Sequence, residues 1–127
     1  MKEIKEYLEK YAALLPLNRS ISYTEAEHRA GEFLSVLAYI ANLRHILSEE
    51  KIKLMSTQTV IYAEELSKAT GKTITENKIH VEASKVYVQA REGLESIEND
   101  LSYLKAYQDL FNNGHLFYRQ MAKGQNE

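Results

Sequence analysis

Glutamate and histidine at helical spacing are the first candidates for chemistry in this sequence. Glu25 and His28 form a Glu-x-x-His step, the unit that projects inward and binds metal in di-iron four-helix bundles. Such a site needs two of these steps and two further glutamates. The chain carries one step, so a dimer would have to supply the second. Glu25 also stands three residues after Ser22, which is the spacing of a helix capping box, and this interpretation is favoured over a metal site.

Clustered carboxylates are the second candidate. Glu92, Glu95 and Glu98 recur every three residues, and Glu64 and Glu65 are adjacent. The all-α nucleotide pyrophosphohydrolases hold Mg²⁺ with a Glu-Glu-x-x-Glu unit and a later Glu-x-x-Asp unit, and the sequence completes neither. The four histidines are dispersed, cysteine is absent and no glycine-rich phosphate loop occurs. We therefore predict a protein that is not an enzyme, with no cofactor and no metal, and the glutamates favour a solvated acidic face.

Basic residues are concentrated between residues 51 and 91. The whole chain has a formal net charge of −2, yet this stretch has seven basic and four acidic residues, which gives +3. Copies of such a patch in an oligomer would add up and attract nucleic-acid phosphates through counterion release. Tyr62 and Tyr87 lie in the same stretch and could stack on unpaired bases. A charged face that only keeps a long helix solvated is the alternative. The predicted DNA-binding residues are Lys51, Lys53, Lys68, Lys72, Lys78, Lys85 and Tyr62.

Helices must position these residues, because the 127-residue chain has one proline, five glycines and little β-branched alternation. An apolar stripe predicts an N-terminal helix over residues 1–15, which Pro16 ends. The capping box at Ser22 begins a long helix, and Gly71 marks a turn near residues 70–75. A second capping box, from Thr73 to Glu76, begins another long helix that reaches residue 112. A break at Asn112-Asn113-Gly114 then precedes a short helix over 115–123.

The expected fold is all-α: a single helical domain over residues 1–127, with two long antiparallel helices in a hairpin over 22–112 and short helices at each end. A hairpin of two long helices has too little interior to bury both apolar stripes. Self-association into an oligomeric helical assembly is the direct physical consequence. No apolar run approaches the ~18 residues of a membrane span, and the first ten residues alternate in charge rather than forming a signal peptide. We expect a cytoplasmic protein with no membrane partner.

The end of the chain has a break at Asn113-Gly114-His115-Leu116 and the ending Met121-Ala122-Lys123-Gly124. In these features, and over roughly residues 30–124, the chain resembles the phage UvsY-like recombination-mediator family. The spacing from Lys85 to Gly114 also looks similar to that between the family's second long helix and its Arg-Gly-Phe break. The resemblance implies a ring-forming accessory protein, in the host cytoplasm if phage-encoded. Such a protein binds single-stranded DNA and helps load a RecA-like recombinase onto a strand coated by a single-strand-binding protein.

The resemblance also implies roles for particular residues. The family's basic DNA contacts lie late in its first long helix, which matches residues 51–62 here and points to Lys51 and Lys53. Thr57-Gln58-Thr59 stands where the family has a Lys-Ala-Arg cluster. The tail helix looks like the family's oligomerisation element. The predicted oligomerisation residues are Leu101, Leu104, Phe111, Leu116, Phe117 and Met121.

Three functions therefore remain open. The first is a non-catalytic, oligomeric recombination accessory protein that binds single-stranded DNA. The second is a structural or regulatory coiled-coil adaptor that binds a protein partner without nucleic acid. The third is a metal-dependent helical enzyme, which would retain bound metal after purification.

Overall fold

A computed structural model describes residues 2–15 and 21–125, and all regular structure in these residues is α-helical. The helices are α1 (Lys2–Ala12), α2 (Tyr23–Lys68), α3 (Ile74–Ala83) and α4 (Lys85–Gln125). The all-α fold class is thus confirmed. The chain divides into two compact units: unit 1 is Met1–Arg44 with Ser102–Glu127, and unit 2 is His45–Leu101. The single domain predicted from the sequence stays a prediction.

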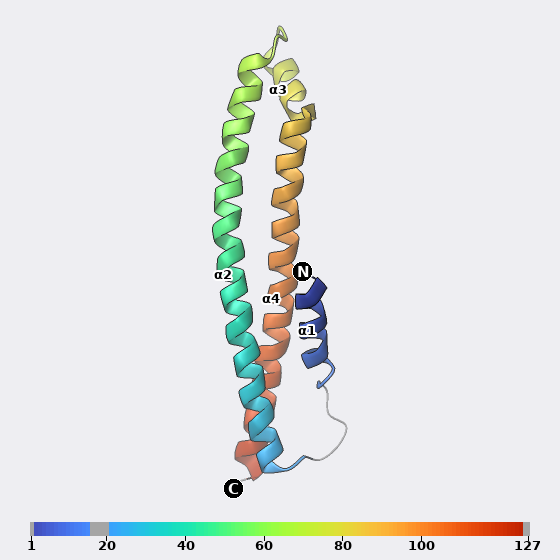
Figure 1. Cartoon of the computed structure of the whole chain (residues 1–127), viewed down its shortest axis with the longest axis vertical. Helices are drawn as coiled ribbons and strands as arrows, with labels where there is room; N and C mark the ends of the chain where they lie inside the picture. The colour runs from blue at the N-terminus through green and yellow to red at the C-terminus, as the bar shows by residue number, and fades with distance from the viewer. Residues whose placement is uncertain (1, 16–20, 126–127) are drawn as a thin grey trace. The chain divides into compact units, whose positions relative to one another are not determined.

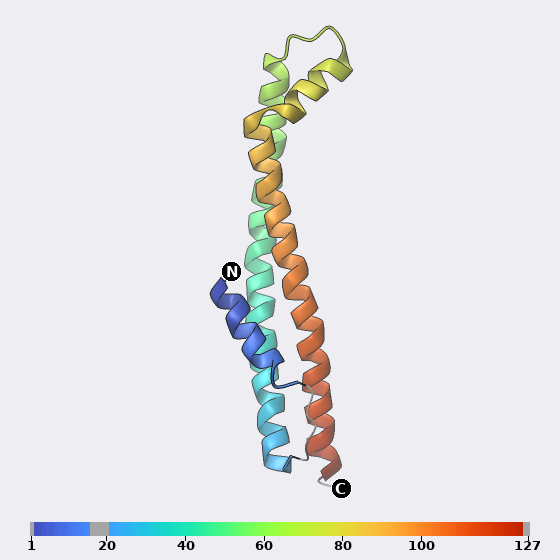
Figure 2. The ribbon, with the colours of Figure 1, turned by 90° about the vertical axis from the view of Figure 1, so that its right-hand side faces the viewer.

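Unit 1 contains three helical segments, because α1 lies against the parts of α2 and α4 in this unit (Figure 1, Figure 2). The segments of α2 and α4 are antiparallel. His115 Nδ1 donates a hydrogen bond to the Ala30 carbonyl oxygen at 2.9 Å, and Arg44 bonds to Gln108. With three segments, side chains at the centre are enclosed from every side. The large side chains with at most 1% exposure in this unit are Leu8, Phe33, Val36, Ile40, Leu104, Phe111 and Tyr118.

Helix α1 is fixed to unit 1 by polar and apolar contacts together. The Tyr118 hydroxyl donates a 2.8 Å hydrogen bond to the Leu14 carbonyl oxygen, just beyond the end of α1. Lys5 Nζ lies 5.1 Å from the centroid of the Tyr103 ring, within cation–π range. Leu8 is fully buried. The helix ends at Ala12 rather than at residue 15, and Pro16, which the sequence predicts as its stop, lies outside the described residues.

Unit 2 has a smaller interior, because α2 and α4 run along it while its third helix, α3, has only ten residues and follows the turn. The two segments are again antiparallel: Lys51 Nζ lies 3.6 Å from a Glu98 carboxylate oxygen, and the Tyr62 and Tyr87 rings are 5.8 Å apart. The buried hydrophobic residues of this unit are Val81 and Ile97. Side chains on the facing surfaces, such as Leu54, Ile61 and Leu94, are only half-buried. Two helices cannot enclose a side chain that a third helix would cover.

Helix α3 and the start of α4 differ from the single long helix predicted from the sequence. Thr73 caps α3 by accepting a 3.1 Å hydrogen bond from the Glu76 amide, and Glu76 accepts one from the Lys72 amide at 2.8 Å. The hydroxyl half of the second capping box is thus confirmed, while the Glu76 carboxylate reaches the amide one residue before the cap. The helix ends at Ala83, however, because Ser84 is extended and begins α4 by accepting a hydrogen bond from the Tyr87 amide. Figure 2 shows α3 turned away from the direction of α4.

The predicted break at residues 112–114 is absent, and the separate helix over 115–123 is instead the last part of α4. Asparagine and glycine each lower helix propensity by at most about 1 kcal/mol, and packing outweighs that cost here. His115 bonds to Ala30, and Tyr118 stacks on Phe33 with ring centroids 5.6 Å apart. These contacts hold both residues on the helix surface that faces α2.

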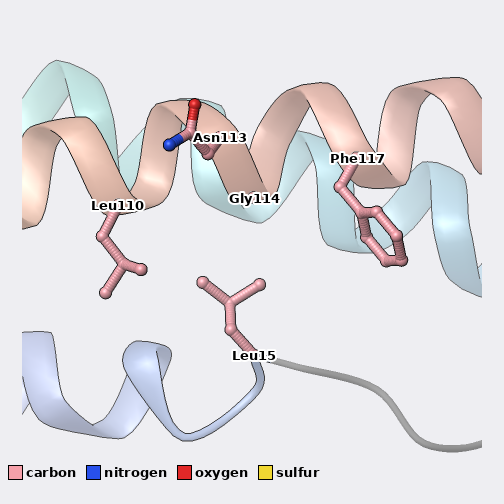
Figure 3. Close-up of a pocket in the computed structure, with 5 residues that line it drawn as sticks. All are labelled: Leu15, Leu110, Asn113, Gly114 and Phe117. Atoms are coloured by element: carbon pink, nitrogen blue, oxygen red, sulfur yellow. The ribbon is translucent and has the colours of Figure 1, made fainter.

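Gly114 lets Leu15 approach the backbone of α4 within unit 1, and it does not form a turn. Figure 3 shows Leu15 pointing at the α4 backbone in the gap between Leu110 and Phe117. The hollow around these residues has a volume of about 230 Å³. A Cβ atom on Gly114 would lie 3.0 Å from a Leu15 methyl carbon, which is tighter than ordinary van der Waals contact. The missing side chain therefore makes room for the residue that follows α1.

Replacing Gly114 with alanine should stabilise the protein less than the same change at Gly93. Alanine in a helix interior is about 0.5–1 kcal/mol more favourable than glycine. A Cβ on Gly93 meets no described atom within 4 Å, so G93A should gain this amount, whereas G114A must displace Leu15. Urea unfolding followed by circular dichroism measures both variants. Equal gains at the two positions would contradict the contact between Leu15 and Gly114.

Candidate functional site

The residues considered for metal binding do not come together. No group of three or more histidine, aspartate or glutamate side chains among the described residues is arranged to hold a metal ion. The Glu25 amide donates to the Ser22 hydroxyl at 3.1 Å, which confirms that Ser22 caps α2. His28 is exposed and lies 3.0 Å from Glu32. The described residues therefore support a helix cap rather than a metal centre at this step.

The acidic residues of α4 act as partners for basic ones. Glu98 pairs with Lys51 across unit 2, and Glu95 lies 3.8 Å from Arg91 on the same helix. Such partly exposed pairs each contribute about 0–1 kcal/mol to stability. Their spacing spreads them over a solvated face, as the sequence analysis favours.

Tyr103 in unit 1 has a strongly altered acidity. Burial of its hydroxyl raises the pKa of Tyr103 to about 12, with smaller contributions from Tyr107 and Glu9. The hydroxyl is buried without a hydrogen-bond partner among the described residues. A phenol with so high a pKa stays neutral at physiological pH and is poorly matched to general acid–base catalysis.

The predicted lysines fall into two groups within unit 2. Lys51 and Lys53 lie on α2, whereas four others surround the turn: Lys68 at the end of α2, Lys72 in the turn, Lys78 on α3 and Lys85 at the start of α4. Fifteen residues separate Lys53 from Lys68, which is about 22 Å along a helix at ~1.5 Å per residue. The positive charge is therefore spread over the unit rather than gathered in one patch.

Most of these lysines have free charges. Lys53, Lys72, Lys78 and Lys85 are exposed, and none forms an ion pair with another described residue. Lys51 is engaged with Glu98, and Lys68 lies 3.7 Å from Glu65. The free ammonium groups are available to phosphates without breaking an existing pair.

The two tyrosines singled out in the sequence do come together. Tyr62 and Tyr87 meet edge to face, and both are half-buried. They line a hollow of about 250 Å³ with Gln58 and Thr59. Gln58 was not predicted as a site residue, although it stands one helical turn before Tyr62. Its place beside Tyr62 follows from the helical spacing within α2, whereas its place beside Tyr87 depends on the pairing of α2 with α4.

The predicted oligomerisation residues lie in different surroundings. Leu104 and Phe111 are fully buried inside unit 1, so they hold one chain together and offer no surface to a second copy. Leu101 and Met121 are half-buried. Leu116 and Phe117 are 43% and 46% exposed. An interface built from the predicted set would have to rely on this exposed pair.

None of the helices in the described part of the chain is long and apolar enough to cross a membrane.

Comparison with known proteins finds a likeness in structure alone. No protein-family model and no curated protein sequence matches the chain. Among solved structures, it is similar to the crystal structure of the recombination mediator protein UvsY of bacteriophage T4, with a TM-score of 0.79 and 14% sequence identity. The match covers 98% of this chain and 95% of the UvsY chain. At this identity the likeness shows a shared fold, which extends over nearly the whole of both chains.

Proposed function

We propose that this protein is a non-catalytic accessory factor of DNA recombination, which assembles into an oligomer, binds single-stranded DNA and assists the loading of a RecA-like recombinase. The observation that carries the proposal is the match to the fold of a recombination mediator over 98% of the chain. A partial match would support only a shared helical hairpin, which many unrelated proteins contain. Here the structural match includes α1 and α3 as well as the two long helices.

The distribution of free lysines supports DNA binding as the mode of action. Exposed ammonium groups along unit 2 neutralise phosphates and release condensed counterions, which favours binding at low salt. Spread charges suit an extended single strand better than a compact anion. Several copies in an oligomer would multiply the number of contacts, so the bound strand would follow the surface of the assembly.

Lys51 can exchange its partly exposed contact with Glu98 for a phosphate, since such a pair contributes only about 0–1 kcal/mol. Replacing Lys51 and Lys53 together with alanine should therefore weaken binding to single-stranded DNA by about tenfold at low salt. Each phosphate contact contributes about 0.7 to the slope of log K against log salt for single strands, so the slope should fall by about 1.4. Fluorescence anisotropy with a labelled oligothymidylate at several salt concentrations measures both quantities. Lys10→Ala with Lys105→Ala in unit 1 is the matched control, since it removes the same charge.

The titration tests the assignment of Lys51 and Lys53 separately from the proposed function. Equal affinity of the Lys51/Lys53 variant and the wild-type protein would reject these two residues as contacts. Failure of the wild-type protein to bind the oligonucleotide at low salt would reject the proposed function.

A protein-binding adaptor is the second candidate, and the surface of α3 favours it. Ile74 and Ile79 are 88% and 61% exposed, which is unusual for isoleucine in a helix of ten residues. Apolar side chains presented in this way suit a protein partner better than DNA. Co-purification of a protein partner by a chain that does not shift a labelled oligonucleotide would favour this function.

A further inference from the structure

The contact between Tyr62 and Tyr87 leaves aromatic surface open to a ligand. Their ring centroids are 5.8 Å apart and the ring planes are inclined at 64°, so the edge of one ring meets the face of the other. In this arrangement each ring cannot cover the other fully, and both side chains remain half-buried. The uncovered ring surface borders the hollow shared with Gln58 and Thr59.

The size of the hollow suits one flat group. Its volume is about 250 Å³, which is below the ~300–1,000 Å³ of pockets that hold drug-sized ligands. A single nucleobase is a flat ligand of suitable extent, and stacking on an aromatic ring is the usual way in which proteins hold an unpaired base.

Polar atoms at the hollow are free to meet the edge of a base. The side chains of Gln58, Tyr62 and Tyr87 form no hydrogen bond with other described residues. A glutamine amide both donates and accepts, so Gln58 can pair with edges of more than one base. Thr59 is less available, because its hydroxyl already donates to the Met55 carbonyl oxygen at 3.0 Å.

One cationic side chain shares the face of Tyr87 on α4. Arg91 follows Tyr87 by one helical turn, and its contact with Glu95 at 3.8 Å is exposed and weak. The half-buried Glu65 carboxylate, about one helical turn after Tyr62 on α2, is paired with Lys68. A phosphate next to the stacked base would thus meet the positive charge of Arg91.

We infer that Tyr62, Tyr87 and Gln58 form a nucleobase subsite, in which one unpaired base of single-stranded DNA stacks on tyrosine while its edge meets the Gln58 amide. The inference rests on the proposed function and goes beyond it. Lysines alone bind the phosphates of any strand, whereas this subsite requires the base itself. The protein therefore distinguishes a strand with bases from a strand that has only the sugar–phosphate backbone.

The first test compares two oligonucleotides of equal length and charge, an oligothymidylate and one made only of abasic sites. The wild-type protein should bind the oligothymidylate about tenfold more tightly, because base–aromatic stacking contributes at least several-fold per base. Replacing both Tyr62 and Tyr87 with leucine should remove most of this preference. Replacing both with phenylalanine should preserve it, since the ring faces remain. Tyr23→Leu, at an exposed tyrosine in unit 1, is the matched control.

The second test needs no substitution and so does not depend on the folding of a variant. Wild-type protein is irradiated with an oligonucleotide that carries 5-iododeoxyuridine, and the crosslinked peptides are mapped by mass spectrometry. Crosslinks at Tyr62 or Tyr87 would support the subsite, and crosslinks only at other residues would overturn it. Equal binding of the abasic and thymidylate strands would also overturn the subsite while leaving the proposed function intact. Failure to bind either strand would overturn both.

Discussion

Replacing Phe33 with alanine is expected to lower the free energy of unfolding by about 3–5 kcal/mol. Phe33 has no exposed surface. The centroid of its ring lies 5.5 Å from that of Phe111, 5.6 Å from that of Tyr118 and 6.4 Å from that of Tyr11. From α2, Phe33 therefore contacts both other helical segments of unit 1, α1 and α4. The loss includes both the transferred apolar surface and the cavity left between these rings. Since proteins have a total stability of about 5–15 kcal/mol, the variant should be largely unfolded at moderate urea.

The neighbouring residue provides the control for this prediction. Leu34 is 56% exposed, so L34A should change the stability by no more than about 0.5 kcal/mol. Urea unfolding monitored by circular dichroism compares the two variants on the same helix. Similar midpoints for F33A and L34A would contradict the placement of Phe33 at the centre of unit 1.

The second large effect concerns assembly. We expect the purified protein to scatter light as a multiple of its 14.6 kDa chain mass, because eight large apolar side chains of unit 2 are exposed and because Leu116 and Phe117, the exposed pair of the predicted oligomerisation residues, lie uncovered on unit 1. Leu116→Ser with Phe117→Ser should reduce the mass toward that of one chain. Leu34→Ser, which alters a comparably exposed apolar residue of unit 1, should leave the mass unchanged.

The absence of cysteine makes a direct check possible. A single cysteine introduced at Leu116 is the sole thiol in the chain, so any disulfide-linked dimer formed on mild oxidation joins two copies at that position. A wild-type mass equal to one chain at micromolar concentration would reject the oligomer, and with it the multiplied positive charge on which wrapping of a DNA strand depends.

Local patterns in the sequence predict the starts of α2 and α3. Both capping boxes depend on residues three apart, Ser22 with Glu25 and Thr73 with Glu76, and both make the expected amide hydrogen bonds. The end of α3 was not predicted, because Ser84 stands between good helix formers and its capping role needs an extended backbone that no nearby glycine or proline signals.

Long-range contacts explain the remaining differences. Gly114 has the local character of a helix end, but the decisive neighbour is Leu15, about a hundred residues earlier in the chain. The burial of Leu104 and Phe111 follows from helices that cover them, which their apolar character alone does not specify. In the candidate site, Tyr62 and Tyr87 were singled out because both lie in the basic stretch. Their ring contact, and the place of Gln58 beside Tyr87, depend on the register of α4 against α2, which the sequence does not encode locally.

The difference in enclosure between the two units has a consequence for amide hydrogen exchange. Backbone amides exchange through local openings, and segments with few buried apolar contacts open at lower free energy. Amides of α2 near Phe33 should therefore exchange slowly with deuterated solvent, and those near Ile61 should exchange faster by orders of magnitude. If a DNA strand or another copy of the chain binds unit 2, it should slow deuterium uptake most in the segment of α2 near Ile61, because this segment is the less enclosed of the two.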